Sequence, residues 1–270
     1  MHESERHRVI LAAVQARPVA TVQELVELTD TSEATIRRDI AALHVQGRLR
    51  RVRGGAEALT PPTQGNLVGR PFSVNETINI GLKRAIAKVA VDLCADGDSI
   101  IINGGTTTYQ MVFHLVNRRC QVFTNSFPIA SHLLGHSKNS VIVPGGTIYR
   151  EQNIILSPFE SDVTKHFYAR RMFMGAQGIG PHGLTEADPL LIQAEQKLLN
   201  QADELVVLAD SSKFRQRSSL ILCKLERIHM VITDRNIRDE DRQMLEERGV
   251  AIRIAGPSDN AEEEVSPSVA

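Results

Sequence analysis

Arginines are concentrated in one short part of this 270-residue chain. A guanidinium group donates two parallel hydrogen bonds to a phosphate or to the edge of a guanine, so clustered arginines are typical of nucleic-acid contact. Residues 34–56 hold one acid, Asp39, and six arginines: Arg37, Arg38, Arg48, Arg50, Arg51 and Arg53. The formal net charge of the whole chain is only −1, so the positive charge is local. The sequence therefore predicts a polyanion-binding surface within this segment.

Two short helices are predicted on the amino-terminal side of these arginines. Apolar residues recur at helical spacing over residues 9–14, and Pro18 would end this first helix. Thr21 can cap a second helix, because Glu24 follows it at the spacing of a capping box. These two helices would support the element that carries Arg37 and Arg38.

A third helix is predicted to carry those two arginines. Thr31 or Ser32 would cap its start, and Gly47 would end it. Its apolar positions fall on one face at about 100° per residue, and they are Ile36, Ile40 and Leu43. Arg38 points away from that face, so it is predicted to meet the edge of a base in the major groove.

The neighbours of Arg38 fit the same interpretation. Thr35 and Arg37 flank it, and Ser32 and Thr35 suit phosphate or base contacts near the start of a helix. Small residues at 41 and 42 would let the helix lie close to the groove. Asp39 is expected to orient a neighbouring arginine.

The remaining arginines predict a basic hairpin. They alternate around two apolar residues, Leu49 and Val52, and are Arg48, Arg50, Arg51 and Arg53. Gly54 and Gly55 would form the turn, and the arginines would hold phosphates or enter the minor groove. A solvated charged helix and strand without a binding role is the alternative. It does not explain why a capped helix, a short turn and a basic hairpin occur together, and that combination predicts a winged helix-turn-helix.

A second kind of chemistry is predicted after residue 100. The apolar run 100–102 reads as a strand and precedes a helix expected to contain Tyr109. The residues between them are polar or glycine, and those predicted to bind a phosphate are Asn103, Gly104, Gly105, Thr106 and Thr107. Glycines let backbone amides approach an anion, and a helix start offers unpaired amides. No Gly-Lys-Thr/Ser follows, so this is not a Walker A loop. An ordinary strand–helix turn is the alternative.

Seven short apolar runs, most of them separated by helical patterns, predict a mainly parallel sheet covered on both faces. They are residues 99–102, 121–124, 140–143, 171–174, 205–208, 230–233 and 250–254. Ligands of such sheets lie beyond the carboxyl ends of the strands. Further candidate ligand contacts follow these runs, and they are Thr124, Asn125, Gly145, Gly146, Gln177 and Lys213. Lys213 can offer a point charge to a phosphate, whereas Asn125 and Gly145, taken alone, are explained better by turn formation than by ligand binding.

Composition divides the chain into four predicted parts. A DNA-binding domain is expected over 1–58 and an α/β domain over 72–255, joined by a linker, 59–71, with three prolines and two glycines. Residues 256–270 are expected to be a disordered tail. The three cysteines form no C-x-x-C pair, so buried thiols in a cytoplasmic protein are expected. No apolar run is long enough for a membrane span, and the sequence suggests no metal or cofactor.

The first domain resembles the DeoR family of bacterial sugar-metabolism regulators. The resemblance rests on Ser32, Thr35–Ile40, Leu43, Gly47, Leu49, Arg51–Val52 and Gly54–Ala56. It implies an operator DNA partner and a sensor domain related in fold to ribose-5-phosphate isomerase, which binds a phosphorylated sugar or polyol. The segments 52–58 and 155–158 look more like the family's regulators of L-ascorbate utilisation, which sense a six-phosphorylated ascorbate, than like its average member. Other sugar or polyol phosphates remain open as the effector.

Two other classes of function remain to be compared with a ligand-controlled repressor. A sugar-phosphate isomerase would need a carboxylate base, but Asp96 and Asp98 precede their strand and no acid–base pair stands out. A purely architectural DNA binder would not need so large a second domain. A regulator is therefore expected and an enzyme is not. One helix-turn-helix reads few base pairs, so a homo-oligomer, a dimer or larger, is also expected.

Overall fold

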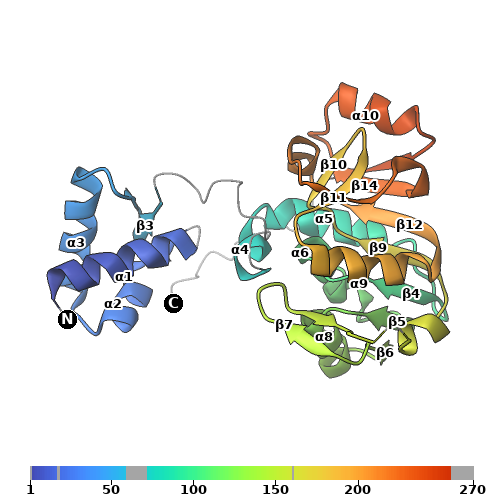
Figure 1. Ribbon diagram of the computed structural model, residues 1–270, viewed down its shortest axis with the longest axis horizontal. Helices are drawn as coiled ribbons and strands as arrows, with labels where there is room; N and C mark the ends of the chain where they lie inside the picture. The colour runs from blue at the N-terminus through green and yellow to red at the C-terminus, as the bar shows by residue number, and fades with distance from the viewer. Residues whose placement is uncertain (1, 17–18, 59–71, 160, 257–270) are drawn as a thin grey trace, which may run out of the picture. The chain divides into compact units, whose positions relative to one another are not determined.

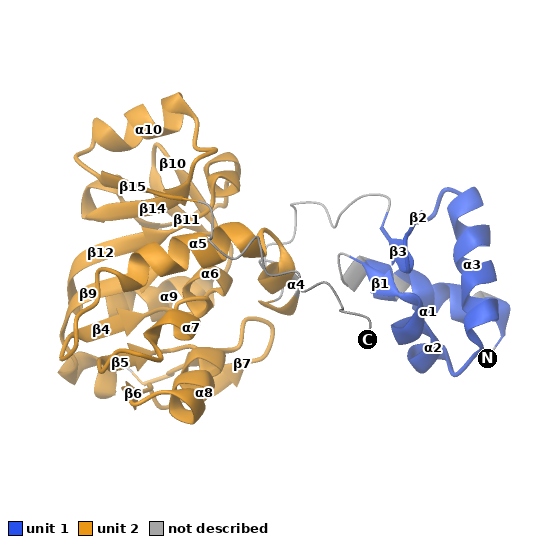
Figure 2. Cartoon of the chain, turned by 180° about the vertical axis from the view of Figure 1, so that it is seen from behind, with its two compact units in different colours: residues 1–66 blue, residues 67–270 orange. Residues whose placement is uncertain are grey.

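The computed structural model (Figure 1) describes residues 2–16, 19–58, 72–159 and 161–256. The chain divides into two compact units, residues 1–66 and residues 67–270 (Figure 2), and each is described by itself. The predicted linker 59–71 and all but the first residue of the predicted tail 256–270 lie outside the described residues. The four predicted domain limits therefore stay predictions. Among the described residues, no helix is both long enough and apolar enough to span a membrane.

Unit 1 contains three helices in the predicted order, α1 (Glu3–Ala16), α2 (Val22–Thr29) and α3 (Glu33–Val45). Thr21 and Glu24 form the expected capping box at the start of α2. Ser32, and not Thr31, caps α3: its hydroxyl accepts a hydrogen bond from the backbone N–H of Thr35. After α3 the chain turns at Gly47, whose φ of +65° lies in the left-handed region that glycine adopts without strain.

A small antiparallel sheet completes unit 1. Its strands are β1 (Ala20–Thr21), β2 (Arg50–Val52) and β3 (Gly55–Glu57), in the order β1-β3-β2. A Cβ atom on Gly55 would lie 2.2 Å from the carbonyl oxygen of Ala20, so only glycine allows β3 to lie so close to β1. The core includes the three residues predicted for the inner face of α3, and the largest fully buried members are Ile10, Leu25, Ile36, Ile40, Leu43 and Leu49.

Asp39 connects two helices of unit 1. The prediction that it orients a neighbouring arginine is wrong about the partner, which is Arg6. Its carboxylate accepts hydrogen bonds from Arg6 of α1, with Nε–Oδ2 at 2.8 Å and Nη2–Oδ1 at 3.3 Å. His7 lies 3.2 Å away, also on α1. Asp39 is one of the few buried charged residues of this unit. Helical periodicity places Asp39 on α3 but contains no information on which residue of α1 it meets.

We expect Asp39→Asn to destabilise unit 1. Burial alone would raise the pKa of Asp39, but the hydrogen bonds and charges of Arg6 and His7 outweigh it, and the pKa lies below its ordinary value. Removing the charge should cost on the order of 2–3 kcal/mol at neutral pH. A carboxylate with a lowered pKa stabilises above its unfolded-state pKa and stops doing so as pH falls through the folded-state pKa. The difference from the wild type should therefore disappear in acid.

Amide hydrogen exchange of α1 and α3 in the full-length chain measures this effect. Glu33→Gln is the matched control, because Glu33 pairs with Arg37 on the exposed side of α3 and such pairs contribute little. Equal loss of protection in the two variants would contradict the assignment.

Unit 2 is built on a seven-stranded sheet in which every neighbouring pair is parallel. Each of the seven predicted runs forms one of its strands. In sheet order these are β15 (Ala251–Ala255), β14 (Met230–Asp234), β12 (Ala202–Leu208), β9 (Ala169–Met174), β4 (Ser99–Ile102), β5 (Gln121–Thr124) and β6 (Ser140–Ile142). The predicted parallel α/β architecture is confirmed.

Helices cover both faces of this sheet (Figure 1). On one face, α5 (Ile80–Val91), α7 (Val112–Leu115) and α8 (Phe127–His136) pack on alternate strand residues such as Ile100 and Ile102. On the other face, α9 (Pro189–Leu199) and α10 (Asp239–Glu246) pack on the residues between them, such as Ile101. Such continuous apolar strands are typical of parallel sheets buried on both sides.

Several elements of unit 2 were not predicted. They include a hairpin of β7 (Thr147–Tyr149) and β8 (Ile154–Leu156), and an antiparallel sheet of β10 (Gly178–Gly180), β11 (Gly183–Glu186) and β13 (Leu220–Cys223). The short helical segments are α4 (Phe72–Thr77), α6 (Thr106–Tyr109), η1 (Val163–His166), η2 (Ser211–Arg215) and η3 (Leu225–Arg227). The expected helix around Tyr109 is in fact two short helices, α6 and α7, and the first begins at Thr106.

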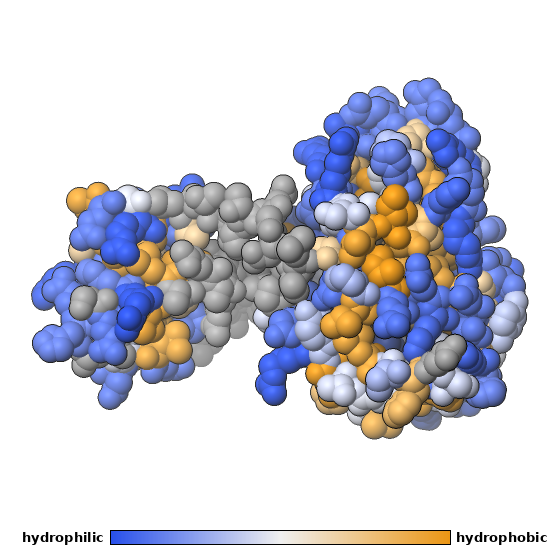
Figure 3. Space-filling view, viewed as in Figure 1, coloured by the Kyte–Doolittle hydropathy of each residue, from blue (hydrophilic) through white to orange (hydrophobic). Residues whose placement is uncertain are grey.

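Some large apolar side chains of unit 2 remain on the surface. Figure 3 shows one face of the protein, on which hydrophobic residues gather over the larger unit. Leu134 and Phe127 on α8 are 79% and 48% exposed, and Phe113 on α7 is 47% exposed. Phe113 also contacts His132 of α8, with ring centroids 4.9 Å apart, so the two helices are neighbours.

Candidate functional sites

The outer face of α3 carries the predicted base-reading residues. Arg37 and Arg38 are exposed, and Thr35 is half-buried. Arg37 donates from Nε to Glu33 one turn earlier, at 2.9 Å. Ser32 caps the helix and lies within hydrogen-bond distance of the Thr35 hydroxyl, at 2.9 Å. Arg38 has no such ion pair among the described residues, so its guanidinium is the one most available to a base.

The four arginines of the predicted wing are all exposed, namely Arg48, Arg50, Arg51 and Arg53. They surround the β2–β3 hairpin, which turns at Gly54 with a φ of +82°. Leu49 is fully buried and Val52 is half-buried, so the hairpin has the expected inner side. Arg50 pairs with Glu57 on the neighbouring strand. The exposed cations and the helix face lie within one compact unit, as a winged helix-turn-helix requires.

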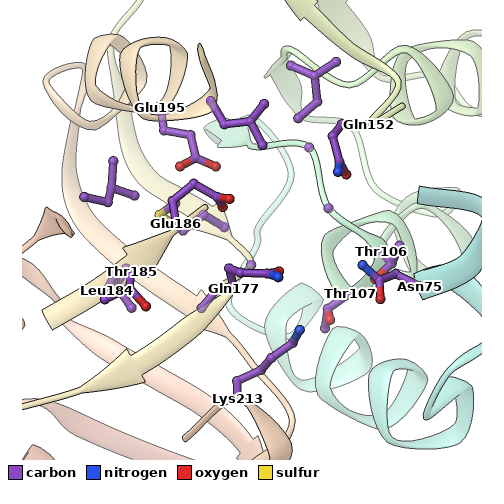
Figure 4. Close-up of a pocket in the computed structure, with 18 of the residues that line it drawn as sticks. Asn75, Thr106, Thr107, Gln152, Gln177, Leu184, Thr185, Glu186, Glu195 and Lys213 are labelled. Carbon is purple, nitrogen blue, oxygen red and sulfur yellow. The ribbon is translucent and has the colours of Figure 1, made fainter. Parts of the chain in front are cut away.

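Unit 2 contains a cavity beyond the carboxyl ends of the central strands β4 and β9 (Figure 4). Its empty volume of about 790 Å³ includes space open to solvent. Six of the predicted ligand residues line it: Gly104, Gly105, Thr106, Thr107, Gln177 and Lys213. Three segments from distant parts of the chain therefore meet as predicted.

The turn after β4 is held by residues that do not themselves line the cavity. Asn125 accepts a hydrogen bond from the backbone N–H of Gly104 through Oδ1, at 2.8 Å. A Cβ on Gly104 would lie 2.8 Å from Cγ1 of Ile154, so glycine lets the β8 strand approach. α6 begins at Thr106, and the first amides of a helix have no partner within it. The Thr107 hydroxyl group is directed toward the same space (Figure 4).

The other five predicted ligand residues lie behind or away from the lining. Asn103 is 1% exposed and donates from Nδ2 to Glu195, at 2.8 Å. Thr124 is fully buried and accepts from the backbone N–H of Ser126. Gly145 and Gly146 are exposed and lead into the β7–β8 hairpin, where a Cβ on Gly146 would meet a backbone carbonyl at 2.1 Å. Of these five residues, Asn103 and Asn125 hold residues that line the cavity.

The cationic side of the cavity contains a lysine that sequence reasoning missed. Lys213 lines the cavity from η2, which begins after the cap residue Asp210. Lys83 on α5 is buried and donates to the backbone carbonyl of Asn75, a residue that also lines the cavity. Burial lowers the pKa of Lys83 to about 8, partly offset by the charge of Asp210. Lys83 thus adds positive potential behind the lining.

Two carboxylates on the opposite side were also missed. Glu186 ends β11 and Glu195 lies in the middle of α9, and both line the cavity. Burial, together with the charge of Glu186, raises the pKa of Glu195 to about 8, against the hydrogen bond from Asn103. Burial also raises the pKa of Glu186. The sequence offers one signal, and it concerns Glu195. This acid follows Leu191 by four residues and therefore lies on the apolar face of a helix.

Two family models match the chain. Residues 6–61 match the model described as "DeoR-like helix-turn-helix domain", and residues 78–235 match the "DeoR C terminal sensor domain". The HTH-type transcriptional regulators UlaR of Shigella dysenteriae serotype 1 (strain Sd197) and Escherichia coli (strain K12 / DH10B) are each 37% identical over 253 residues, covering 93% of this chain and 99% of theirs. These matches confirm the predicted family and the prediction of a regulator in place of an enzyme.

Solved structures show only a limited likeness. A ribose 5-phosphate isomerase A from Methanocaldococcus jannaschii has a TM-score of 0.38 and 21% identity, covering 50% of this chain and 54% of that one. An eIF2B delta from Chaetomium thermophilum also has a TM-score of 0.38, with 18% identity and coverage of 53% and 50%. Likenesses at this level support no conclusion about function.

We expect the ligand-free protein to lose stability as pH rises, and Glu195→Gln to remove part of that loss. A carboxyl group whose pKa is raised from 4.5 to about 8 keeps its proton in the folded state where the unfolded chain has released it. The unfolded state therefore binds fewer protons between these values, and stability falls with rising pH. Glutamine cannot ionise, so the variant's melting temperature should rise relative to the wild type between about pH 5 and pH 8.

Thermal unfolding across that pH range measures the difference. Glu226→Gln is the control, because Glu226 is exposed and its pKa is lowered by a backbone hydrogen bond and by its pair with Arg248 at 2.7 Å. If the melting temperature of the Glu195→Gln protein equalled that of the wild type at every pH, the placement of this carboxyl group would be contradicted.

Proposed function

Because the chain belongs to the DeoR family of DNA-binding transcriptional regulators, we propose that it represses a carbohydrate-utilisation operon and is released by a phosphorylated sugar or polyol. One observation carries the proposal. The glycine–threonine turn Gly104–Thr107 and the ammonium group of Lys213 line the same cavity in the sensor unit. Backbone amides at a helix start and a lysine point charge are what a phosphate group binds.

The proposed mechanism is thermodynamic linkage between two sites. Unit 1 binds operator DNA through Arg38 in the major groove and through the wing arginines on phosphates. A sugar phosphate that binds more tightly to the DNA-incompetent state shifts the population towards that state. By reciprocity, operator DNA weakens effector binding by the same factor. The coupling needs no enzymatic step.

A homo-oligomer is part of the proposal. A single α3 would contact only a few base pairs, and tight specific binding is reached when two copies read two half-sites. The exposed apolar residues Phe113, Phe127 and Leu134 on neighbouring helices of unit 2 support an interface between copies.

Six-phosphorylated L-ascorbate is the first effector to be tested among sugar and polyol phosphates. The segments 52–58 and 155–158 resemble those of ascorbate-utilisation regulators, and UlaR is similar along almost the whole chain. The phosphate end of any of these compounds would occupy the same turn and lysine.

We expect the two groups of arginines to affect DNA binding differently. Arg38→Ala should remove about 1–3 kcal/mol of discrimination between the operator and a mismatched site. Arg51→Ala should weaken binding to both DNAs alike and reduce the slope of log affinity against log salt by about 1. Binding titrations at several salt concentrations, on an operator selected with the full-length protein, measure both quantities.

Arg242→Ala is the control, because this exposed arginine belongs to unit 2. An Arg38→Ala protein that still discriminated fully would show that another face of unit 1 reads the bases.

We expect Lys213→Met to shift the effector response to higher concentrations of sugar phosphate while leaving operator affinity unchanged. A hydrogen bond to a charged group contributes about 1.5–3 kcal/mol, so the affinity for the sugar phosphate should fall on the order of 10- to 100-fold. Release of labelled operator DNA by increasing sugar phosphate measures the effect. Lys224→Met changes an exposed lysine of the same unit and should behave like the wild type. Normal release from the Lys213→Met protein would exclude Lys213 from the phosphate site.

A further inference from the structure

The two sides of the cavity differ in charge. Figure 4 shows the carboxylates of Glu186 and Glu195 on one side, with Lys213, Thr106 and Thr107 on the other. A phosphate group bound by the turn and the lysine would leave the carboxylates to the rest of the ligand. A carboxylate repels a phosphate, so this second side serves a different part of the molecule.

Glu195 is placed to receive hydrogen bonds that the protein does not supply. The residue is 5% exposed and lies on α9, with its carboxylate directed into the cavity (Figure 4). Its Oε1 atom accepts from Nδ2 of Asn103 at 2.8 Å. Its Oε2 atom is buried and has no hydrogen-bond partner among the described residues. A buried acceptor left without a donor is unfavourable, and native structures seldom keep one without a purpose.

The surroundings of Glu195 show that it is not part of an internal ion pair. The apolar side chains Leu191 and Leu222 line the same cavity. The charged neighbour is Glu186, whose own carboxylate accepts from the backbone N–H of Ala187 at 2.6 Å. No salt bridge of either glutamate occurs among the described residues. Because the pKa of Glu195 is raised to about 8, its carboxyl group keeps its proton at neutral pH while the cavity is empty. Hydroxyl donors on a ligand favour the ionised form, which accepts hydrogen bonds. Two acidic groups with a spare acceptor are therefore held next to each other at the ligand's expected position.

Sugar and polyol hydroxyls are donors that suit such a pair. Each hydroxyl group donates one hydrogen bond, and two carboxyl groups offer several acceptor positions. Sites that hydrogen-bond a ligand hydroxyl discriminate strongly against analogues without it, because the buried acceptors then stay unpaired. An apolar phosphate ester, or inorganic phosphate alone, would leave Oε2 of Glu195 without a donor.

We propose that Glu195, assisted by Glu186, determines ligand specificity by accepting hydrogen bonds from the hydroxyl groups of a polyhydroxylated phosphate ester. This inference rests on the proposed function, since it assumes that the turn and Lys213 bind the phosphate. Asn103 is the positioning residue: it fixes Oε1 and leaves Oε2 for the ligand. Specificity is thus separated from phosphate affinity within one cavity.

The test compares binding of two kinds of probe to the full-length protein. The first is inorganic phosphate, and the second is a panel of pentitol, hexitol, hexose and L-ascorbate phosphates, from which the tightest ligand is used. For the wild type we expect the tightest panel member to bind at least about 10-fold more tightly than inorganic phosphate. At about pH 9, where Glu195 of the wild type is ionised, Glu195→Gln should weaken that ligand on the order of 10- to 100-fold and leave inorganic phosphate unchanged.

Two variants make the result decisive. Glu186→Gln should weaken the panel ligand to a smaller degree, again without affecting inorganic phosphate. Lys213→Met should weaken both probes, because it acts on the phosphate. Unchanged binding of inorganic phosphate also shows that the glutamate variants are folded around the site.

Three outcomes would overturn either the role of the two glutamates or the proposed function, and each outcome can be told apart from the others. Equal weakening of both probes by Glu195→Gln would give Glu195 a structural role only. A panel in which no member exceeds inorganic phosphate would show that the cavity does not read hydroxyl groups. If neither inorganic phosphate nor any ester binds, or if Lys213→Met changes neither, the proposed function itself fails.

Discussion

The parallel alignment of β4, β9 and β12 is the constraint on which the ligand cavity depends. Ile102 lies beside Phe173, and Phe173 lies beside Val206, so the three strands end at the same edge of the sheet. The backbone N–H of Asn103 continues this ladder by donating to the carbonyl of Phe173 at 2.8 Å. Parallel strands need crossovers, and the crossovers bring segments that are far apart in sequence to that edge. Without this register, the glycine–threonine turn, Gln177 and Lys213 would not line one space.

The sequence was sufficient to predict a mainly parallel sheet, but not its strand order, its register or the elements built on it. Each of the seven strands of the sheet is a continuous apolar run, which stands out against the polar loops around it. The strands β10, β11 and β13 are short: β10 and β11 pair across a two-residue turn, whereas β11 pairs with β13 across more than 30 residues, a partner that local pattern does not indicate. Glu186 and Glu195 reach the cavity through that antiparallel sheet and through α9. Their burial could not be predicted, because it is created by partners that the sequence does not place.

The predicted ligand residues also show the difference between what a local sequence pattern indicates and what tertiary contacts decide. Glycines and hydroxyl residues after a strand indicate the edge of the sheet correctly, but not which side chains face the cavity. Asn103 and Asn125 are used instead to hold Glu195 and Gly104 in place. Each of these buried amides makes one hydrogen bond that holds a lining residue, although Oδ1 of Asn103 and Nδ2 of Asn125 have no partner among the described residues. Unit 1 shows the same difference: the caps of α2 and α3 are local and were predicted, whereas the ion pair of Asp39 with Arg6 is tertiary and was not.

The spare acceptor on Glu195 bears on how a ligand can act as a signal. An unpartnered buried oxygen makes the ligand-free cavity less stable by about 1–3 kcal/mol, and a donor on the ligand removes that penalty. A phosphate group alone gains the turn and the lysine but leaves the penalty in place. The hydroxyl groups therefore add free energy that only the correct ligand supplies, and a ligand shifts a conformational equilibrium only by its differential affinity for the two states. If the two states differ in the placement of α9 or β11, the hydroxyl contacts contribute directly to that difference. The phosphate contacts would then provide affinity, and the carboxylate contacts would decide which phosphate ester releases the operator.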